Sequence, residues 1–225
     1  MDTSARDFRR FDEDDDSAFY SFPRRVVHID DGAIAALTRL YAALVPAGVR
    51  VLDLMGSWRS HLPASFGGAA IGLGLNAVEM AENPHLAAAV VHDLNREPGL
   101  PFADAAFDAV VCAVSVQYLT RPLDVFREVR RVLRPGAPFV VSFSNRCFPD
   151  KAVALWRASD DSSTSRSSPP TSPTRRNRAA PGPRWRLSST RRGGAIPSMP
   201  SGRGATPVTP PHSVRSWEAL PRRSR

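Results

Sequence analysis

The chain has 225 residues, 42% of them hydrophobic, and carries 30 basic against 22 acidic side chains. This length and composition are typical of a globular protein with one ordinary domain and flanking segments. No apolar run reaches the roughly 18 to 20 residues that a membrane-spanning helix needs, and the N-terminus is acidic and aromatic where a signal peptide would be basic and then apolar. We therefore expect no membrane partner and a cytoplasmic location.

Residues 1–25 mix aromatic side chains with an acidic run at 12–16 and follow neither a helical nor a strand period. We interpret this segment as an N-terminal arm that packs on the surface of the folded domain. The alternative is that its aromatic side chains form a lid over the mouth of an active site.

Residues 26–158 alternate between strand-like and helix-like patterns. An amphipathic helix is predicted over 34–44, with Asp30 or Asp31 as its N-cap. The strand-like segments are short and apolar, and they lie at 49–54, 69–75, 88–91, 107–114 and 138–143. Further helices are predicted at 76–82 and 123–133. Strands and helices in alternation predict a mostly parallel sheet between two helical layers, a three-layer α/β sandwich.

Ligands of an open parallel sheet bind at the carboxyl ends of its strands, so polar residues at those ends are candidate site residues. Strand one continues as VLDLMGSWR, strand two ends in IGLGLN, and strand three runs into VHDL. The fourth strand lies in LPFADAAFDAVV, and the helix before strand five ends in RVLRPG. In this order and spacing, the motifs resemble the S-adenosylmethionine-dependent, Rossmann-like methyltransferases of type 11.

The resemblance covers about 130 residues and implies S-adenosylmethionine as the cofactor and an unassigned methyl acceptor as the second partner. In the family, the acid that ends strand one contacts the amino group of the methionine moiety, and an acid after strand three contacts the adenine amine. These acids correspond to Asp53 and Asp93. We expect Gly56 and Leu94 to line the same cofactor pocket.

The first loop departs from the family's D-x-G-x-G-x-G pattern, because Met55, Ser57 and Arg59 occupy the three glycine positions. Arg59 is a candidate to pair with the cofactor's carboxylate. The family's ribose-binding acid falls on Gly74, which leaves Asn76 as the nearest neutral substitute. These departures leave open an alternative function, a non-catalytic binding protein on a methyltransferase fold.

No catalytic residue can be assigned, because methyl transfer needs mainly the alignment of acceptor and cofactor. Residues near the expected acceptor side are Ser115, Gln117, Tyr118, Asn145 and Arg146, and candidate general bases are His28, His61 and His92. Cys112 and Cys147 have no neighbours that suggest a metal site, and we interpret them as core thiols.

Residues 159–225 change to Ser, Pro, Arg, Gly and Thr, and we expect this tail to be disordered. From residue 162 onward it holds 13 Arg, no Lys and one acid, which leaves a net charge of −4 on residues 1–161. The resemblance also implies a helix and two further strands after strand five, and because no such segments are visible we expect a domain truncated on its C-terminal side, with an unpaired edge at strand 138–143. One hypothesis is that the tail is read in a shifted frame. The alternative is a genuine basic tail that binds nucleic-acid phosphates.

Overall fold

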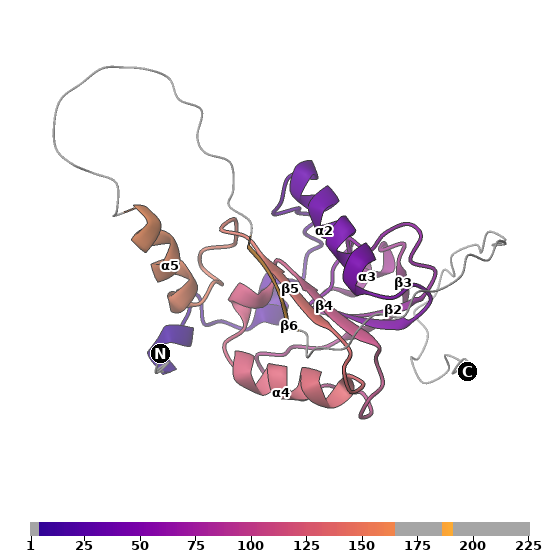
Figure 1. Ribbon diagram of the computed structural model, residues 1–225. Coiled ribbons are helices and arrows are strands. Elements are labelled where there is room, and N and C mark those ends of the chain that lie inside the picture. Colours follow the sequence, from indigo (N-terminus) through magenta and orange to yellow (C-terminus); the bar gives the residue numbers. More distant parts are fainter. Residues whose placement is uncertain (1–4, 165–185, 191–225) are drawn as a thin grey trace, which may run out of the picture.

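The computed structural model describes residues 5–164 and 186–190, and in it six strands form one sheet in the order β3-β2-β1-β4-β5-β6 (Figure 1). Strands β1 to β5 are parallel, and β6 is antiparallel to β5. The strands are β1 (Arg50–Leu54), β2 (Ala69–Gly74), β3 (Leu86–Val91), β4 (Ala109–Ala113), β5 (Phe139–Phe143) and β6 (Arg186–Thr190). Because β1 lies between β2 and β4, the strand order reverses there, and a ligand crevice is expected at that point.

Helices cover both faces of this sheet. The described helices are η1 (Ala5–Phe8), α1 (Asp16–Phe19), α2 (Asp31–Leu44), α3 (Ala77–Ala81), η2 (Val116–Tyr118), α4 (Pro122–Val132) and α5 (Ala154–Thr164). Figure 1 shows α2 and α3 on one face and α4 on the other. The predicted three-layer, mostly parallel α/β fold is confirmed.

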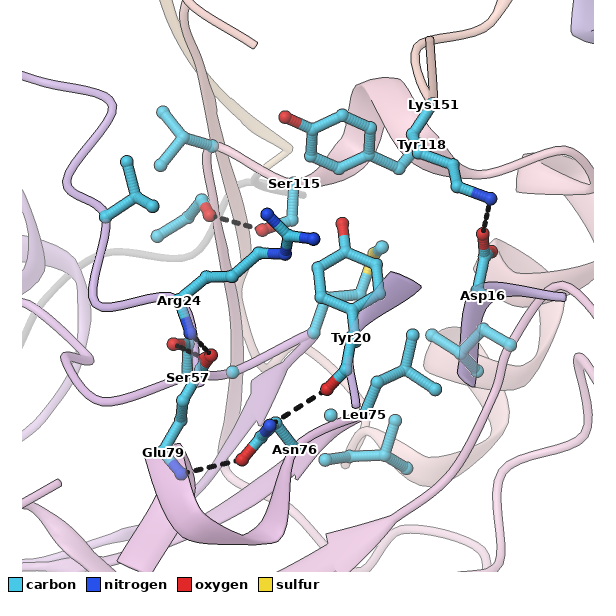
Figure 2. A pocket seen from close by; sticks show the side chains of 18 of the residues that line it. Asp16, Tyr20, Arg24, Ser57, Leu75, Asn76, Glu79, Ser115, Tyr118 and Lys151 are labelled. Carbon is cyan, nitrogen blue, oxygen red and sulfur yellow. Dashed lines mark hydrogen bonds and ion pairs between the residues drawn. The ribbon is translucent and has the colours of Figure 1, made fainter. Parts of the chain in front are cut away.

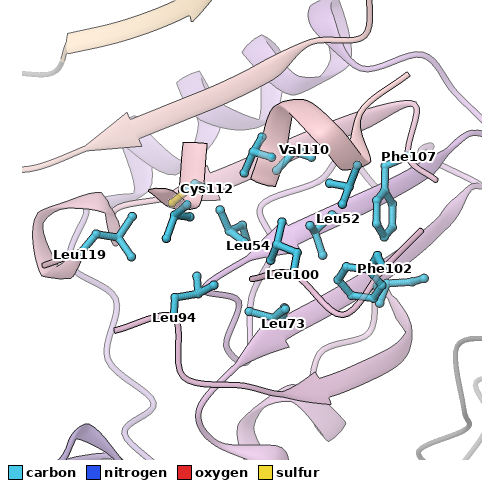
Figure 3. Packing of buried hydrophobic residues seen from close by; sticks show 14 residues of the cluster. Leu52, Leu54, Leu73, Leu94, Leu100, Phe102, Phe107, Val110, Cys112 and Leu119 are labelled. Carbon is cyan, nitrogen blue, oxygen red and sulfur yellow. The ribbon is translucent and has the colours of Figure 1, made fainter. Parts of the chain in front are cut away.

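The core follows from the alternation of side chains along the strands. In β1, Val51 packs beneath α2 with Leu37 and Tyr41, whereas Leu52 and Leu54 point to the opposite face. On that face they meet the apolar side of α4 and the turn that carries Phe102 and Phe107 (Figure 3). Cys112 is a free, buried thiol in this second cluster, as the sequence predicts. The two clusters fix the strands and hold their carboxyl ends in a common register.

The helix termini carry the predicted signals. The Asp30 carboxylate accepts a hydrogen bond from the backbone N–H of Ala33 at 2.9 Å and so caps α2. Helix α4 begins at Pro122 and ends after Arg130 and Arg131, whose charges favour the carbonyl end of a helix.

The C-terminal side differs from the sequence prediction at α5 and β6, because α5 continues to Thr164 and β6 spans Arg186–Thr190 within the segment expected to be disordered. The predicted unpaired edge at 139–143 is wrong, because β6 pairs with β5 from Phe139 opposite Thr190 to Phe143 opposite Arg186. Periodicity could not identify β6, since it lies in a polar segment with no apolar alternation to set a strand period. The rest of the predicted disordered tail, residues 165–185 and 191–225, lies outside the described residues.

Within the described ranges, no helix combines the length and the apolarity that crossing a bilayer requires.

Candidate functional site

A pocket opens at the carboxyl ends of β1, β2, β3 and β4 and is bordered by the N-terminal arm (Figure 2). Of the predicted cofactor residues, all six line it, namely Asp53, Gly56, Arg59, Asn76, Asp93 and Leu94. The structure therefore brings together residues that lie up to 41 positions apart in the sequence.

Asp53 ends β1 and lies at the base of this pocket. Its side chain is buried, and the Ser60 hydroxyl donates a hydrogen bond to the carboxylate at 2.5 Å. Burial raises the pKa of Asp53 to about 7, although the Ser60 hydrogen bond lowers it. A cation that reaches this buried carboxyl group would stabilise its ionised form.

The loop after β1 is tightly folded against β2. Met55 has a φ of 57°, in the left-handed region that glycine adopts most easily. The backbone N–H of Gly56 donates to the carbonyl of Leu73 at 2.9 Å, and a β-carbon on Gly74 would collide with the carbonyl oxygen of Gly56. The packing explains why no acid can stand at position 74, where the family resemblance places one.

Asn76 has structural contacts on both sides of its amide. The side-chain oxygen caps α3 by accepting from the backbone N–H groups of Val78 and Glu79 at 2.9 and 3.0 Å. The side-chain nitrogen donates to the Tyr20 carbonyl of the arm at 2.9 Å. Asn76 thus joins the first turn of α3 to the arm at the end of β2.

Glu79 is a pocket residue that the sequence reasoning missed. Its carboxylate is buried and accepts hydrogen bonds from the Ser57 hydroxyl and from the backbone N–H of Arg24. The available signal was the spacing of Asn76 and Glu79, which matches an N-cap residue followed by an acid at the third helical position. Glu79 supplies an acid on the β2 side of the pocket, where Gly74 supplies none.

Asp93 and Leu94 follow β3. One carboxylate oxygen of Asp93 accepts from the backbone N–H of Asn95 at 2.8 Å and of Arg96 at 3.4 Å, which fixes the turn. Leu94 is buried and joins the α4-side core while also lining the pocket. His92 lines the pocket too, and its ring contacts the carbonyl of Glu97.

Arg59 lies at the exposed rim of the pocket, and its guanidinium stacks on Trp58 at 4.2 Å from the ring centre. Trp58 in turn donates to the carbonyl of Val26 at 3.4 Å. His61, two residues on, is largely buried, and its pKa is lowered to about 4 by burial and by the nearby charge of Arg59.

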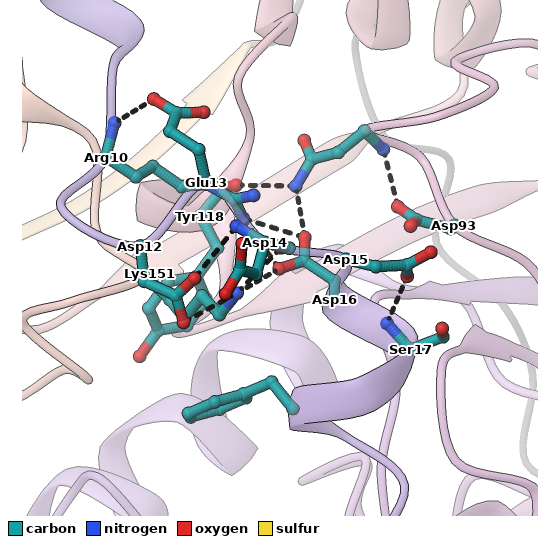
Figure 4. A network of polar contacts seen from close by, with 12 residues as sticks. Arg10, Asp12, Glu13, Asp14, Asp15, Asp16, Ser17, Asp93, Tyr118 and Lys151 are labelled. Atoms are coloured by element: carbon teal, nitrogen blue, oxygen red, sulfur yellow. Dashed lines mark hydrogen bonds and ion pairs between the residues drawn. The ribbon is translucent and has the colours of Figure 1, made fainter.

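The arm is held by a cluster of buried charges (Figure 4). Lys151, the only lysine in the chain, lies 2.9 Å from a carboxylate oxygen of Asp12 and 3.1 Å from one of Asp16. Arg10 binds both oxygens of Asp16 at 2.8 and 2.7 Å. Asn95 adds a hydrogen bond to Asp16 at 2.8 Å, so the arm is connected to the turn after β3. The acidic run at 12–16 is therefore a docking segment.

The far side of the pocket is formed by residues after β4 and β5. Ser115, Tyr118, His28 and Phe148 line this side. His61 and His92 line other parts of the pocket. The Tyr118 hydroxyl accepts from the backbone N–H of Phe148 at 2.9 Å, and the His28 ring packs edge-on against Phe148. Gln117, Asn145 and Arg146 do not line the pocket; Gln117 is buried and donates to the carbonyl of Val114.

Comparison with known proteins gives a match over the central segment of the chain. A family model described as "Methyltransferase domain" matches residues 64–141. The biotin biosynthesis bifunctional protein BioHC of Teredinibacter turnerae is 34% identical over 62 residues, which are 28% of this chain and 11% of that protein.

Solved structures with a similar fold include an S-adenosylmethionine-dependent methyltransferase from Mesorhizobium loti. It is 21% identical, with a TM-score of 0.38, over 47% of this chain and 52% of that one. The [4+2]-cyclase SpnF is also 21% identical, with a TM-score of 0.45 over 63% of this chain and 61% of that one. The chain thus spans about a tenth of the curated relative and roughly half to three fifths of these two structures.

Proposed function

We propose that this chain, whose residues 64–141 match a methyltransferase-domain family model, binds S-adenosylmethionine and transfers its methyl group to an acceptor. The observation that carries the proposal is the pocket at the switch point of the sheet, which both Asp53, near the end of β1, and Asp93, just after β3, line. A fold alone does not establish a reaction, so the proposal depends on the charge and hydrogen-bonding groups that these side chains offer the cofactor.

The donors and acceptors of the pocket suit a cationic, adenosine-containing ligand. Asp53 is buried and its described side-chain partner is the neutral Ser60 hydroxyl, so an ammonium group would supply the counter-charge that burial makes favourable. Asp93 has a second carboxylate oxygen for which no partner is described, and it would accept from the adenine amine. Leu94 and Met55 supply apolar surface beside these two acids.

When bound, S-adenosylmethionine supplies a methyl group on a positively charged sulfur. The chain's own contribution is to align the acceptor and exclude water. Asp53 would hold the amino group of the methionine moiety, and Asp93 the adenine. Glu79 and Asn76 lie on the β2 side, where a ribose would lie in such an arrangement. The acceptor would enter along Ser115, Tyr118 and Phe148.

His28 is the pocket histidine placed to take a proton from the acceptor. It packs against Phe148 on the acceptor side, and partial burial lowers the pKa of its imidazole, which favours the neutral ring that can accept a proton.

The proposal is tested by calorimetric titration of S-adenosylhomocysteine into the full-length chain and into Asp53→Asn, Asp93→Asn and Asp31→Asn variants. Asp31 is an exposed acid on α2, outside the pocket, and serves as the matched control. We expect saturable binding that weakens at least tenfold in the two pocket variants and is unchanged in the control. A folded chain that binds no S-adenosylhomocysteine would overturn the proposal.

A second candidate function, a non-catalytic binding protein on the same fold, is favoured by the closed first loop. Met55 in a left-handed conformation and the tight contact between Gly56 and Gly74 replace the open glycine loop of the family. This function predicts that the titration finds no binding. The hypothesis of nucleic-acid binding through the basic tail concerns a segment that mostly lies outside the described residues.

A further inference from the structure

Arg24 reaches from one side of the pocket to the other. Its backbone N–H is anchored to the Glu79 carboxylate on the α3 side. Its guanidinium lies 4.1 Å from the centre of the Phe19 ring and 5.8 Å from that of Phe148, on the side formed after β4 and β5. Figure 2 shows the side chain extending across the pocket towards Ser115, with the hydroxyl of Tyr20 beside the guanidinium.

The charge of Arg24 is not matched by an acid in the part of the chain that the structure describes. Its described donor contacts are from Nε and Nη2 to the carbonyl oxygen of Phe19, each at 3.1 Å. By contrast, Arg10 and Lys151, two pocket cations whose side chains are buried, both pair with Asp16. Nη1 of Arg24 has no described partner and Nη2 carries a second N–H, so these two nitrogens remain as donors for a ligand. A planar guanidinium in this setting favours a carboxylate, which it binds with two parallel hydrogen bonds.

The surroundings strengthen this preference. Phe19 and Phe148 face the guanidinium, Figure 2 shows Tyr20 beside it, and Tyr118 packs against Phe148. Aromatic side chains around the guanidinium limit its contact with water, which strengthens a charge-assisted hydrogen bond. Arg59, the cation that the sequence nominates for a carboxylate, instead lies exposed on Trp58 at the rim.

We infer that the methyl acceptor carries a carboxylate, which Arg24 binds beside the aromatic wall of Phe19 and Phe148. The inference rests on the proposed function, because it assigns the cofactor to the Asp53 side of the pocket and the acceptor to the β4 side. The methionine moiety of the cofactor is a second source of the same chemistry, and binding experiments can distinguish the two.

The first experiment separates the cofactor from the acceptor. Full-length protein and its Arg24→Met, Arg24→Lys and Arg25→Met variants are titrated with S-adenosylhomocysteine and with 5′-methylthioadenosine, which lacks the amino-acid moiety. Arg25 is the matched control, since it is exposed and pairs with Glu82 outside the pocket. We expect all four proteins to bind S-adenosylhomocysteine within threefold of each other. A loss of tenfold or more in Arg24→Met, with 5′-methylthioadenosine binding unchanged, would assign Arg24 to the cofactor and overturn the inference.

The second experiment uses the protein saturated with S-adenosylhomocysteine and titrates it with two matched pairs of probes, benzoate with benzamide and phenylacetate with phenylacetamide. We expect each carboxylate to bind at least tenfold more tightly than its amide, and the preference to vanish in Arg24→Met, to persist in weaker form in Arg24→Lys and to be unchanged in Arg25→Met. Equal affinity for acid and amide, no binding of either acid, or a preference that survives Arg24→Met would each overturn the inference. Failure of the wild-type chain to bind S-adenosylhomocysteine would instead count against the proposed function.

Discussion

Gly74 faces the backbone of Gly56 so closely that a β-carbon at position 74 would collide with the Gly56 carbonyl oxygen. Gly74 ends β2, and Gly56 is tied to the same strand through its hydrogen bond to Leu73. The first loop and the end of β2 therefore form one closed unit beneath the pocket.

Gly74→Ala should lower the free energy of unfolding by about 2 to 3 kcal/mol, because the collision is with backbone and cannot be relieved by a rotamer change. Gly74→Asp, which restores the acid of the family pattern, should be more destabilising still. The measurement is chemical denaturation, with Gly99→Ala as control, since a β-carbon there meets only the flexible end of Glu97. A loss below about 0.5 kcal/mol in Gly74→Ala would show that the loop moves freely.

The layers of the fold could be predicted because their signals are local. Apolar strands, the amphipathic pattern of α4 and the Asp30 cap lie within single segments of the sequence, and strand ends in a parallel sheet meet at one edge. Asp53 and Asp93 could be placed in one pocket for the same reason. Glu79 could not, because its partners Ser57 and Arg24 lie in segments that only the folded chain brings to it.

The arm is the clearest case of a feature that no local pattern reveals. The acidic run at 12–16 has no period, and its partner Lys151 lies 135 positions from Asp16 in the sequence. The position of Arg24 could not be predicted from a local pattern either. Only the folded chain shows that its guanidinium crosses the pocket while Arg59 remains at the rim.

Asp53 should make stability depend on pH in a defined direction. Its pKa is about 7 in the fold against 3.8 for a free aspartate side chain, so the folded chain binds this proton more tightly than the unfolded chain. Wild-type stability therefore falls as pH rises from about 4 through 7, by a few kcal/mol in all, and is level above that range as far as this group is concerned. In urea denaturation, Asp53→Asn should gain stability relative to wild type between pH 4.5 and pH 8. A difference that stays constant over this range would contradict the assignment.

His61 should also make stability depend on pH, in this case between pH 4 and 6.5, because its surroundings favour the neutral imidazole. Its folded pKa of about 4 is below the value of 6.5 for a free imidazole, so the folded chain binds this proton less tightly than the unfolded chain. The contribution of His61 is complete above about pH 6.5 and is lost as pH falls towards 4. The free energy of unfolding of wild type relative to His61→Gln should therefore fall as pH is lowered from 6.5 to 4, as urea denaturation measures. Equal slopes for both proteins between pH 4 and 6.5 would exclude this role.

Asn76 allows the helix cap and the arm tether to be separated. Asn76→Ala removes both and should lower the free energy of unfolding by about 1 to 2 kcal/mol. Asn76→Asp keeps an oxygen that caps α3 but cannot donate to the Tyr20 carbonyl. It should retain most of the stability while tryptic cleavage after the exposed Arg25 becomes faster. Equal cleavage rates in wild type and Asn76→Asp would show that the tether does not hold the arm.

Lys151 can report on arm docking because it is the only lysine in the chain and its side chain is 1% exposed. It sits among Asp12, Asp16 and the Asp14 carbonyl, to which its ammonium donates at 2.9 Å. A buried ammonium paired in this way is protonated and shielded, so an amine-reactive ester should modify the N-terminal amino group long before Lys151. Peptide mass analysis over time measures the two rates.

Removing the acids tests whether the cluster causes this protection. Asp16→Asn leaves Arg10 and Lys151 with one charged partner fewer, and loss of one member of a buried ion pair costs about 3 to 5 kcal/mol when the remaining charge is left uncompensated. Lys151 acylation should then accelerate at least tenfold, while Glu82→Gln, which breaks the exposed pair with Arg25, should leave the rate unchanged. If Asp16→Asn acylates at the wild-type rate in a chain that remains folded, burial against neutral neighbours protects Lys151, and the charge cluster is not what docks the arm.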